Sequence, residues 1–162
     1  MGFGRVHGPR EVNKMELDAT DRKLLNLLQE DTKVPYAKLA KRLGISSSGV
    51  HKRVKRLVDE GVIKKFAAVI DPQILGKKLK AFIGISTAPG TCGEVIAQLN
   101  KRPEVLEIHE VAGEHDLFVK VITDDTAKLN EILHEMDRIP GVSNSRTLIV
   151  LKTEKETSLL RL

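Results

Sequence analysis

The chain has 162 residues, of which 27 are Lys or Arg and 22 are Asp or Glu, so its formal net charge is +5. This length fits one ordinary domain or two small ones, and the 41% hydrophobic content predicts a globular, soluble protein without a membrane helix. The absence of a secretory signal pattern and the single Cys92 indicate a cytoplasmic location. The aromatic content of only 3% argues against recognition of single-stranded RNA by base stacking.

Charge is distributed unevenly along the chain. Residues 1–70 contain 15 basic and 8 acidic residues, whereas residues 71–162 contain 12 and 14. The change coincides with Asp71-Pro72, where proline interrupts regular structure. We therefore predict an N-terminal extension at 1–15, a basic helical domain at 16–70, a hinge at 71–80, a second domain at 81–156 and a C-terminal tail at 157–162.

Three helices are predicted in the basic domain. Asp18 is a favourable N-cap for the first helix, whose leucines at 24, 25, 27 and 28 repeat at helical spacing up to residue 30. The second helix begins at Pro35 and ends at Gly44, because proline is tolerated in the first turn and glycine favours the C-terminal stop. Ser46 caps the third helix, which runs to residue 60.

The third helix has two different faces. Val50, Val54, Leu57 and Val58 form one apolar stripe that predicts a core contact, and the opposite side is cationic. Two helices joined by a glycine turn, the second led by small hydroxyl residues, are typical of a helix-turn-helix that reads double-stranded DNA. The DNA-binding residues predicted here are Lys41, Arg42, Ser46, Ser47, Ser48, His51, Lys52, Arg53, Lys55 and Arg56.

An extended segment follows at residues 62–70, where Lys64 and Lys65 are consistent with a winged variant of this motif. The same helices could also form a protein-interaction adaptor with a solvated basic face. The coincidence of the turn, the serines and the polarity favours DNA.

The second domain contains an internal repeat. Residues 81–87 resemble residues 117–123, and residues 102–105 resemble residues 139–142, at offsets of about 36. Helical patterns at 94–101 and 126–138 lie between them, so we predict an α+β fold with a ferredoxin-like βαββαβ domain. Such a sheet leaves one face without helices, which predicts a homodimer formed sheet to sheet.

The segment from Val111 to Asp116 lies between two predicted strands. A hairpin turn alone explains Gly113 and Asp116. Alternatively, the backbone N–H groups near Gly113 and the carboxylate of Asp116 hold the carboxylate and ammonium of a small effector. The histidines fit no metal-ligand spacing, and no catalytic or nucleotide-binding motif is present, so we expect no metal, no cofactor and no enzyme activity.

Several segments together resemble one family. They are Asp21-Arg-Lys-Leu-Leu, Leu39-Ala-Lys-Arg-Leu-Gly-Ile-Ser, Val50-His-Lys-Arg-Val-Lys-Arg-Leu, Gly61-Val-Ile-Lys-Lys-Phe and Ile70-Asp-Pro. In order and spacing, residues 16–156 resemble the leucine-responsive regulatory protein/AsnC family of transcriptional regulators. The resemblance implies dyad-symmetric DNA sites, dimers or octamers, and an amino-acid effector. It implies an effector pocket near Gly113, Glu114, His115 and Asp116, with Thr123 as a weaker candidate.

Two other classes of function remain open from the sequence. One is a metabolic sensor or enzyme with a ferredoxin-like regulatory domain, and the other is the helical adaptor. The basic first half and the serine-led third helix favour the DNA-binding regulator over both.

Overall fold

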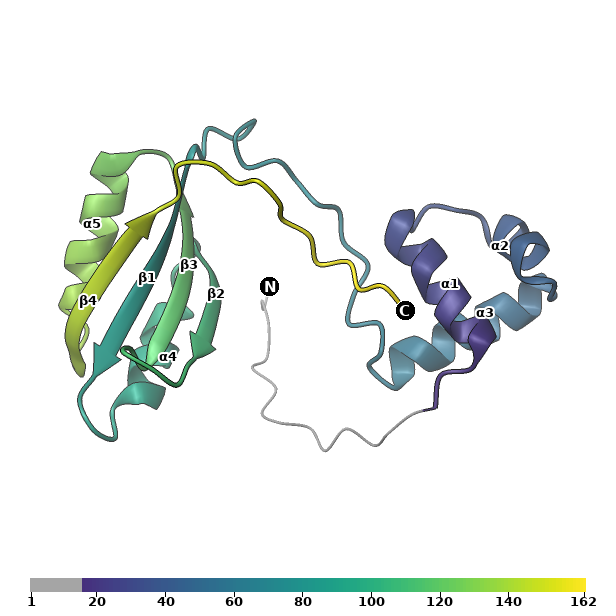
Figure 1. Cartoon of the computed structure of the whole chain (residues 1–162), viewed down its shortest axis with the longest axis horizontal. Coiled ribbons are helices and arrows are strands. Elements are labelled where there is room, and N and C mark those ends of the chain that lie inside the picture. Colours follow the sequence, from purple (N-terminus) through teal and green to yellow (C-terminus); the bar gives the residue numbers. More distant parts are fainter. Residues whose placement is uncertain (1–15) are drawn as a thin grey trace. The chain divides into compact units, whose positions relative to one another are not determined.

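The computed structural model describes residues 16–162 (Figure 1). The predicted N-terminal extension at 1–15 therefore lies outside the described residues. The described chain divides into two compact units, one containing residues 16–68 with 157–162 and the other containing residues 69–156. The segment predicted as a tail, 157–162, thus groups with the helices of the first unit, and the strand expected to follow the hinge begins at Leu79.

The first unit contains the three predicted helices, α1 (Ala19–Glu30), α2 (Tyr36–Leu43) and α3 (Ser47–Asp59). Asp18 and Asp21 form a capping box at the start of α1: the Asp18 carboxylate accepts the Asp21 N–H at 2.7 Å, and the Asp21 carboxylate accepts the Asp18 N–H at 3.3 Å. The helices enclose a small apolar core formed by Leu24, Leu25, Leu28, Leu39, Ala40, Val50, Val54 and Leu57.

The turn between α2 and α3 follows from two residues. Gly44 has φ +67°, a left-handed conformation that glycine adopts without steric cost, and this ends α2. The Ser46 hydroxyl then accepts the Gly49 N–H at 3.0 Å and caps α3. Val58, predicted to face the core, is 42% exposed because it lies at the edge of the apolar stripe.

The extended segment predicted at 62–70 has no strand partner. Residues 64–71 carry no assigned helix or strand, although the Ile63 N–H donates to the Leu57 carbonyl at 2.9 Å and the Ile63 side chain packs on the core. The first unit is therefore held by helix packing, because within its described residues there is no β-ladder.

The second unit has the predicted βαββαβ order. Its elements are β1 (Leu79–Thr87), α4 (Cys92–Leu99), β2 (Val105–Glu110), β3 (Leu117–Thr123), α5 (Thr126–Asp137) and β4 (Val142–Ile149). The sheet order is β2-β3-β1-β4, with every neighbouring pair antiparallel. Helix α4 begins and ends two residues earlier than predicted, and a turn at residues 100–104 separates it from β2.

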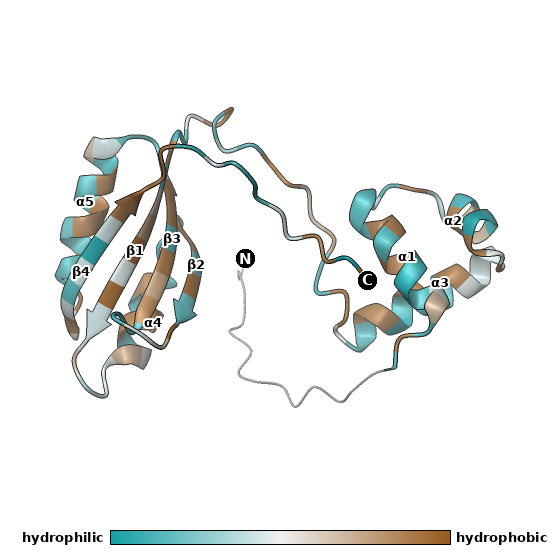
Figure 2. Cartoon of the chain, in the orientation of Figure 1, coloured by the Kyte–Doolittle hydropathy of each residue, from teal (hydrophilic) through white to brown (hydrophobic). Residues whose placement is uncertain are grey.

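One face of this sheet carries both helices. Alternate side chains of β1 and β3 are buried with side chains of α4 and α5, as period-2 alternation requires. Figure 2 shows the resulting concentration of hydrophobic residues in the central strands. This core contains Ala81, Ile83, Ile85, Val95, Leu99, Leu117, Val119, Val121, Leu129, Ile132, Met136 and Ile139.

The turn before β4 depends on Gly141, which has φ +97°. A Cβ atom at this position would lie 2.5 Å from the Thr91 Oγ1 atom. We expect Gly141→Ala to lower the free energy of unfolding of the second unit by about 1–3 kcal/mol, because it combines backbone strain with a steric clash. Denaturant titration measures this loss.

Gly93→Ala is the matched control, because Gly93 lies in α4 and a Cβ atom added there would have no heavy atom within 4 Å. Its stability should stay the same or rise by up to about 1 kcal/mol. Equal stability of wild type and Gly141→Ala would contradict the prediction.

Candidate nucleic-acid interface and effector loop

The exposed face of α3 carries the candidate DNA-binding cations. Ser48, Lys52 and Lys55 are exposed and lie opposite the buried Val50, Val54 and Leu57 stripe. Lys41 and Arg42 are basic residues in the last turn of α2. Among residues 16–162, no acidic side chain lies within ion-pair distance of Lys41, Arg42, Lys52 or Lys55. Their charges are therefore available to a polyanion.

Small polar groups surround the start of α3. The Ser46 hydroxyl caps the helix and lies 3.0 Å from the Ser48 hydroxyl, and Ser47 is exposed like both of them. The exposed His51 ring makes an edge contact with the Tyr36 ring, at a centroid distance of 6.0 Å. Small side chains and the positive end of the helix dipole let the backbone of this turn approach phosphates or base edges closely.

Arg53 and Arg56 have a different environment from the other predicted cations. The Arg53 Nη1 atom lies 2.7 Å from carboxylate oxygens of both Asp18 and Asp21, and the Arg56 Nη2 atom lies 2.5 Å from the second Asp21 oxygen. The two arginines lie on the flank of α3 that faces the start of α1. Their charges are thus paired within the unit, in contrast to Lys52 and Lys55.

The Asp21 carboxylate is the centre of this arrangement, which we call the Asp21 clamp (Asp18, Asp21, Arg53 and Arg56). The Asp21 side chain is 1% exposed, and both of its oxygens accept charge-assisted hydrogen bonds. The Arg53 guanidinium lowers the pKa of the Asp18 carboxyl below its usual value, and Asp18 and Asp21 raise the pKa of Arg53. The clamp therefore fixes the orientation of α3 relative to α1.

From the sequence, Asp21 appears only in the segment Asp21-Arg-Lys-Leu-Leu that resembles the family, and its first role in the structure is in the capping box of α1. Its second role could have been recognised from the two arginines spaced i, i+3 on a flank of α3, because that spacing places both guanidinium groups on one side of a helix.

Asp21→Asn removes the negative charge at nearly constant volume. We expect it to destabilise the first unit by about 1–3 kcal/mol, because two guanidinium groups lose a charged hydrogen-bond partner. Asp59→Asn is the control, since Asp59 is exposed on α3. Thermal unfolding followed by circular dichroism compares the variants, and equal midpoints for the two would refute the clamp.

Three consecutive side chains of the candidate effector loop each make a different contact with the sheet. The Glu114 carboxylate pairs with Arg146 of β4 at 2.8 Å. The His115 ring covers Gly84 of β1 so closely that a Cβ there would lie 2.2 Å from the ring. The Asp116 carboxylate accepts the Thr87 N–H at 2.6 Å and the Thr87 hydroxyl at 3.2 Å. The loop is thus attached to β1 and β4, and Gly113, which precedes these three residues, is exposed.

Thr123 lies at the opposite end of β3 from this loop, so the chain does not bring it together with Gly113 to Asp116. The Thr123 side chain is buried, and its hydroxyl has no hydrogen-bond partner among the described residues.

A cavity of about 400 Å³ lies beside Asp116. The other residues that line this cavity belong mostly to the turn before α4 and to the end of β2. They could not be predicted from the sequence, because these segments approach Asp116 only in the folded domain. Burial and the neighbouring Glu110 raise the pKa of the Cys92 thiol, so the thiol is neutral near pH 7. The cavity is lined by Thr87, Ala88, Pro89, Gly90, Cys92, Glu110, Val111 and Asp116.

Within residues 16–162, no three His, Cys, Asp or Glu side chains are grouped as a metal site. In the same part of the chain, no helix has the length and apolarity needed to span a membrane.

Comparison with known proteins defines the class of this molecule. Residues 17–64 match the winged helix-turn-helix DNA-binding family, and residues 80–160 match the Lrp/AsnC ligand binding domain. A DNA-binding helix-turn-helix joined to a ligand-binding domain is the organisation of a transcriptional regulator. The chain belongs to the Lrp/AsnC family of transcriptional regulators. This finding confirms the predicted α+β fold and favours the regulator over the adaptor and the metabolic sensor.

Relatives cover nearly the whole chain. The HTH-type transcriptional regulator FL11 of Pyrococcus horikoshii is 42% identical over 147 residues, which are 91% of this chain and 97% of that protein. The crystal structure of the Neisseria meningitidis regulator NMB0573 in complex with L-Met superposes with a TM-score of 0.85 at 30% identity, covering 90% of this chain and 96% of that one. E. coli AsnC gives a TM-score of 0.86 at 28% identity, covering 90% and 99%.

Proposed function

We propose that this regulator binds double-stranded DNA with the exposed face of α3 in the major groove, and that it acts in the cytoplasm without catalysing a reaction. The observation that supports this proposal is that the cations on α3 fall into two groups, one exposed and one paired with a carboxylate. Lys52 and Lys55 are exposed and lack an ion-pair partner among residues 16–162, whereas Arg53 and Arg56 are held by Asp21. The lysines therefore supply phosphate contacts, and the arginines orient the helix.

Ser47, Ser48 and His51 are the base-reading candidates of this proposal, because they are exposed at the start of α3. Ser46 contributes through its cap, which keeps the first turn of α3 in place. Lys41 and Arg42 add phosphate contacts from α2.

Lys52→Glu/Lys55→Glu should abolish DNA binding without unfolding the protein, because both side chains are exposed and outside the Asp21 clamp. A dimer should make roughly 6 to 8 phosphate contacts, which gives a slope of about −5 to −7 in log K against log salt concentration for the wild type. Fluorescence anisotropy with the DNA upstream of the protein's own gene measures both quantities.

Lys78→Glu/Lys101→Glu is the matched control. It changes the net charge equally, at two exposed positions of the second unit. Equal affinity losses in the two double variants would contradict a specific role for α3 and leave only the effect of net charge.

We further propose that the helix-free face of the sheet forms the homodimer. Phe82 of β1 and Phe118 of β3 project from this face and stack at 5.6 Å between ring centroids, and Leu148, which pairs with Phe82 across the sheet, is 54% exposed. Aromatic and aliphatic groups on a sheet face that carries no helix favour burial against a second copy. Such a dimer has two α3 helices and suits a dyad-symmetric site, and larger assemblies such as an octamer would add contacts between dimers.

Phe118→Asp should convert the dimer to a monomer at micromolar concentration, because it buries a carboxylate in the apolar interface. Val69→Asp is the control, since Val69 is 98% exposed. Sedimentation velocity distinguishes the species, and a dimer that persists in Phe118→Asp would refute this face as the interface.

An amino acid is the proposed effector, bound at the cavity beside the Gly113 to Asp116 loop. The Neisseria meningitidis relative was crystallised with L-Met, which supports this class of ligand. In this chain, Asp116 and Glu110 border the cavity and supply carboxylates for an ammonium group. The exposed backbone at Gly113 supplies N–H donors for a carboxylate, while Glu114 and His115 hold the loop against Arg146 and Gly84. Thr123 would take part only through another subunit.

Asp116→Asn keeps an oxygen that can accept the Thr87 N–H but removes the charge that would pair with the ammonium. We expect it to weaken amino-acid binding at least tenfold, about 1.4 kcal/mol. Calorimetric titration with the twenty amino acids, L-methionine included, measures this change. Asp59→Ala, in the first unit, should bind as the wild type does. Unchanged affinity in Asp116→Asn would show that the loop is only a turn.

A further inference from the structure

The chain connects the two units twice. The first connection runs through residues 68 and 69, within the linker that precedes β1, and the second runs through Glu156 and Thr157, after β4. Residues 150–162 contain no helix or strand, yet hydrogen bonds hold them at both ends. We call this segment the strap.

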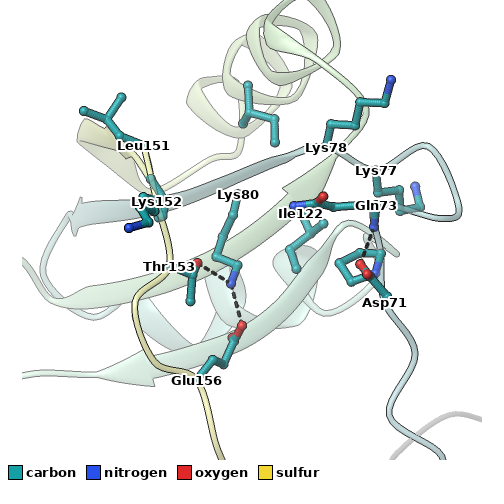
Figure 3. A pocket seen from close by; sticks show the side chains of 13 residues that line it. Asp71, Gln73, Lys77, Lys78, Lys80, Ile122, Leu151, Lys152, Thr153 and Glu156 are labelled. Carbon is teal, nitrogen blue, oxygen red and sulfur yellow. Dashed lines mark hydrogen bonds and ion pairs between the residues drawn. The ribbon is translucent and has the colours of Figure 1, made fainter.

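The first end of the strap is attached to the second unit. The Val150 N–H donates to the Lys80 carbonyl at 2.9 Å, and the Lys80 Nζ atom donates to the Thr153 hydroxyl at 3.2 Å and lies 2.5 Å from the Glu156 carboxylate (Figure 3). Lys120 of β3 pairs with the other Glu156 oxygen. The side chains of Lys80 and Lys120 are only 17% and 12% exposed, whereas the Glu156 side chain is 51% exposed, so solvent partly screens these two ion pairs.

Hydrogen bonds from Lys120 and Lys80 lower the pKa of Glu156 to about 2, from an ordinary value of 4.5. Because the pKa is lowered in the folded state, the stabilisation by this carboxylate is fully present above pH 4.5 and is lost as the pH falls toward 2. The attachment is therefore intact at neutral pH.

The second end of the strap is attached to α1. The Gln29 side chain donates to the Leu160 carbonyl at 2.8 Å and accepts the Leu160 N–H at 2.7 Å. Its amide group thus pairs with both backbone groups of Leu160, as the backbone of a neighbouring β-strand would. Asn26, about one helical turn earlier on α1, donates to the Leu162 carbonyl at 3.1 Å. Because these bonds involve the backbone of the strap, they hold an extended peptide by its main chain.

We propose that the flank of α1 at Asn26 and Gln29 is a docking surface for residues 157–162 of the same chain, and that the docked strap restrains the DNA-binding unit. The structure supports this occupant because Leu160 and Leu162 are hydrogen-bonded to that surface, and the segment is joined to Glu156, which is itself held by two lysines. Helix α1 also carries the Asp21 clamp. A restraint on α1 is thus passed to α3.

The docking itself is tested by hydrogen exchange of the full-length protein, without DNA or effector. In the wild type, the Leu160 amide should exchange at least about tenfold more slowly than an unprotected amide, and Gln29→Leu should remove this protection. Gln98→Leu, at an exposed glutamine of α4, should leave it unchanged. Fast exchange of the Leu160 amide in the wild type, or equal protection in Gln29→Leu, would overturn the proposal.

The restraint on DNA binding, which rests on the proposed function, is tested by a double-mutant cycle. Gln29→Leu and Glu156→Ala should each weaken binding to a site with two half-sites by roughly three- to tenfold, because a released unit loses more freedom on binding. The double variant should have the same affinity as whichever single variant binds DNA more weakly. Each substitution alone already releases the strap, so the second adds no further loss. Additive losses would overturn the restraint. Failure of the wild type to bind DNA would instead refute the proposed function, and hydrogen exchange would still decide the docking.

Discussion

The buried Asp21 carboxylate is the interaction on which the DNA-binding unit depends. A three-helix unit whose described residues form a core of eight buried hydrophobic side chains has little apolar area with which to fix helix orientation. A charge with both oxygens bonded to guanidinium groups of α3 supplies the orientation that a small core lacks. The same carboxylate is part of the capping box of α1, so one residue both starts one helix and orients another.

This arrangement gives the cations of α3 two physical roles. Arginine suits the clamp because its planar guanidinium can form several directional hydrogen bonds with carboxylates. Lysine suits the exposed face because a flexible ammonium group adapts to phosphates without a fixed geometry. The composition of the helix, with both types of cation interleaved, therefore reflects two different partners, one inside the protein and one outside it.

Local patterns were sufficient to predict most of the fold. The Asp18 and Ser46 caps, the stop at Gly44 and the repeated strand segments at 81–87 and 117–123 each depend on near neighbours in the chain. Contacts between distant segments could not be predicted in this way. Three such contacts depend on how the helices and strands pack. They are the ion pair of Asp21 with Arg56, the packing of His115 on Gly84 and the hydrogen bonds of Leu160 with Gln29.

Because Gly84 has no side chain, ligand binding at the loop and self-association through the sheet would be connected. His115 occupies the space above this glycine, on the helix-free face of the sheet. One end of the candidate effector loop is therefore part of the surface that a second copy would cover. A ligand that moves His115 would alter that surface, so occupancy of the loop and association of two chains would be linked equilibria. By reciprocity, the apparent affinity for the ligand would then vary with the concentration of the protein itself.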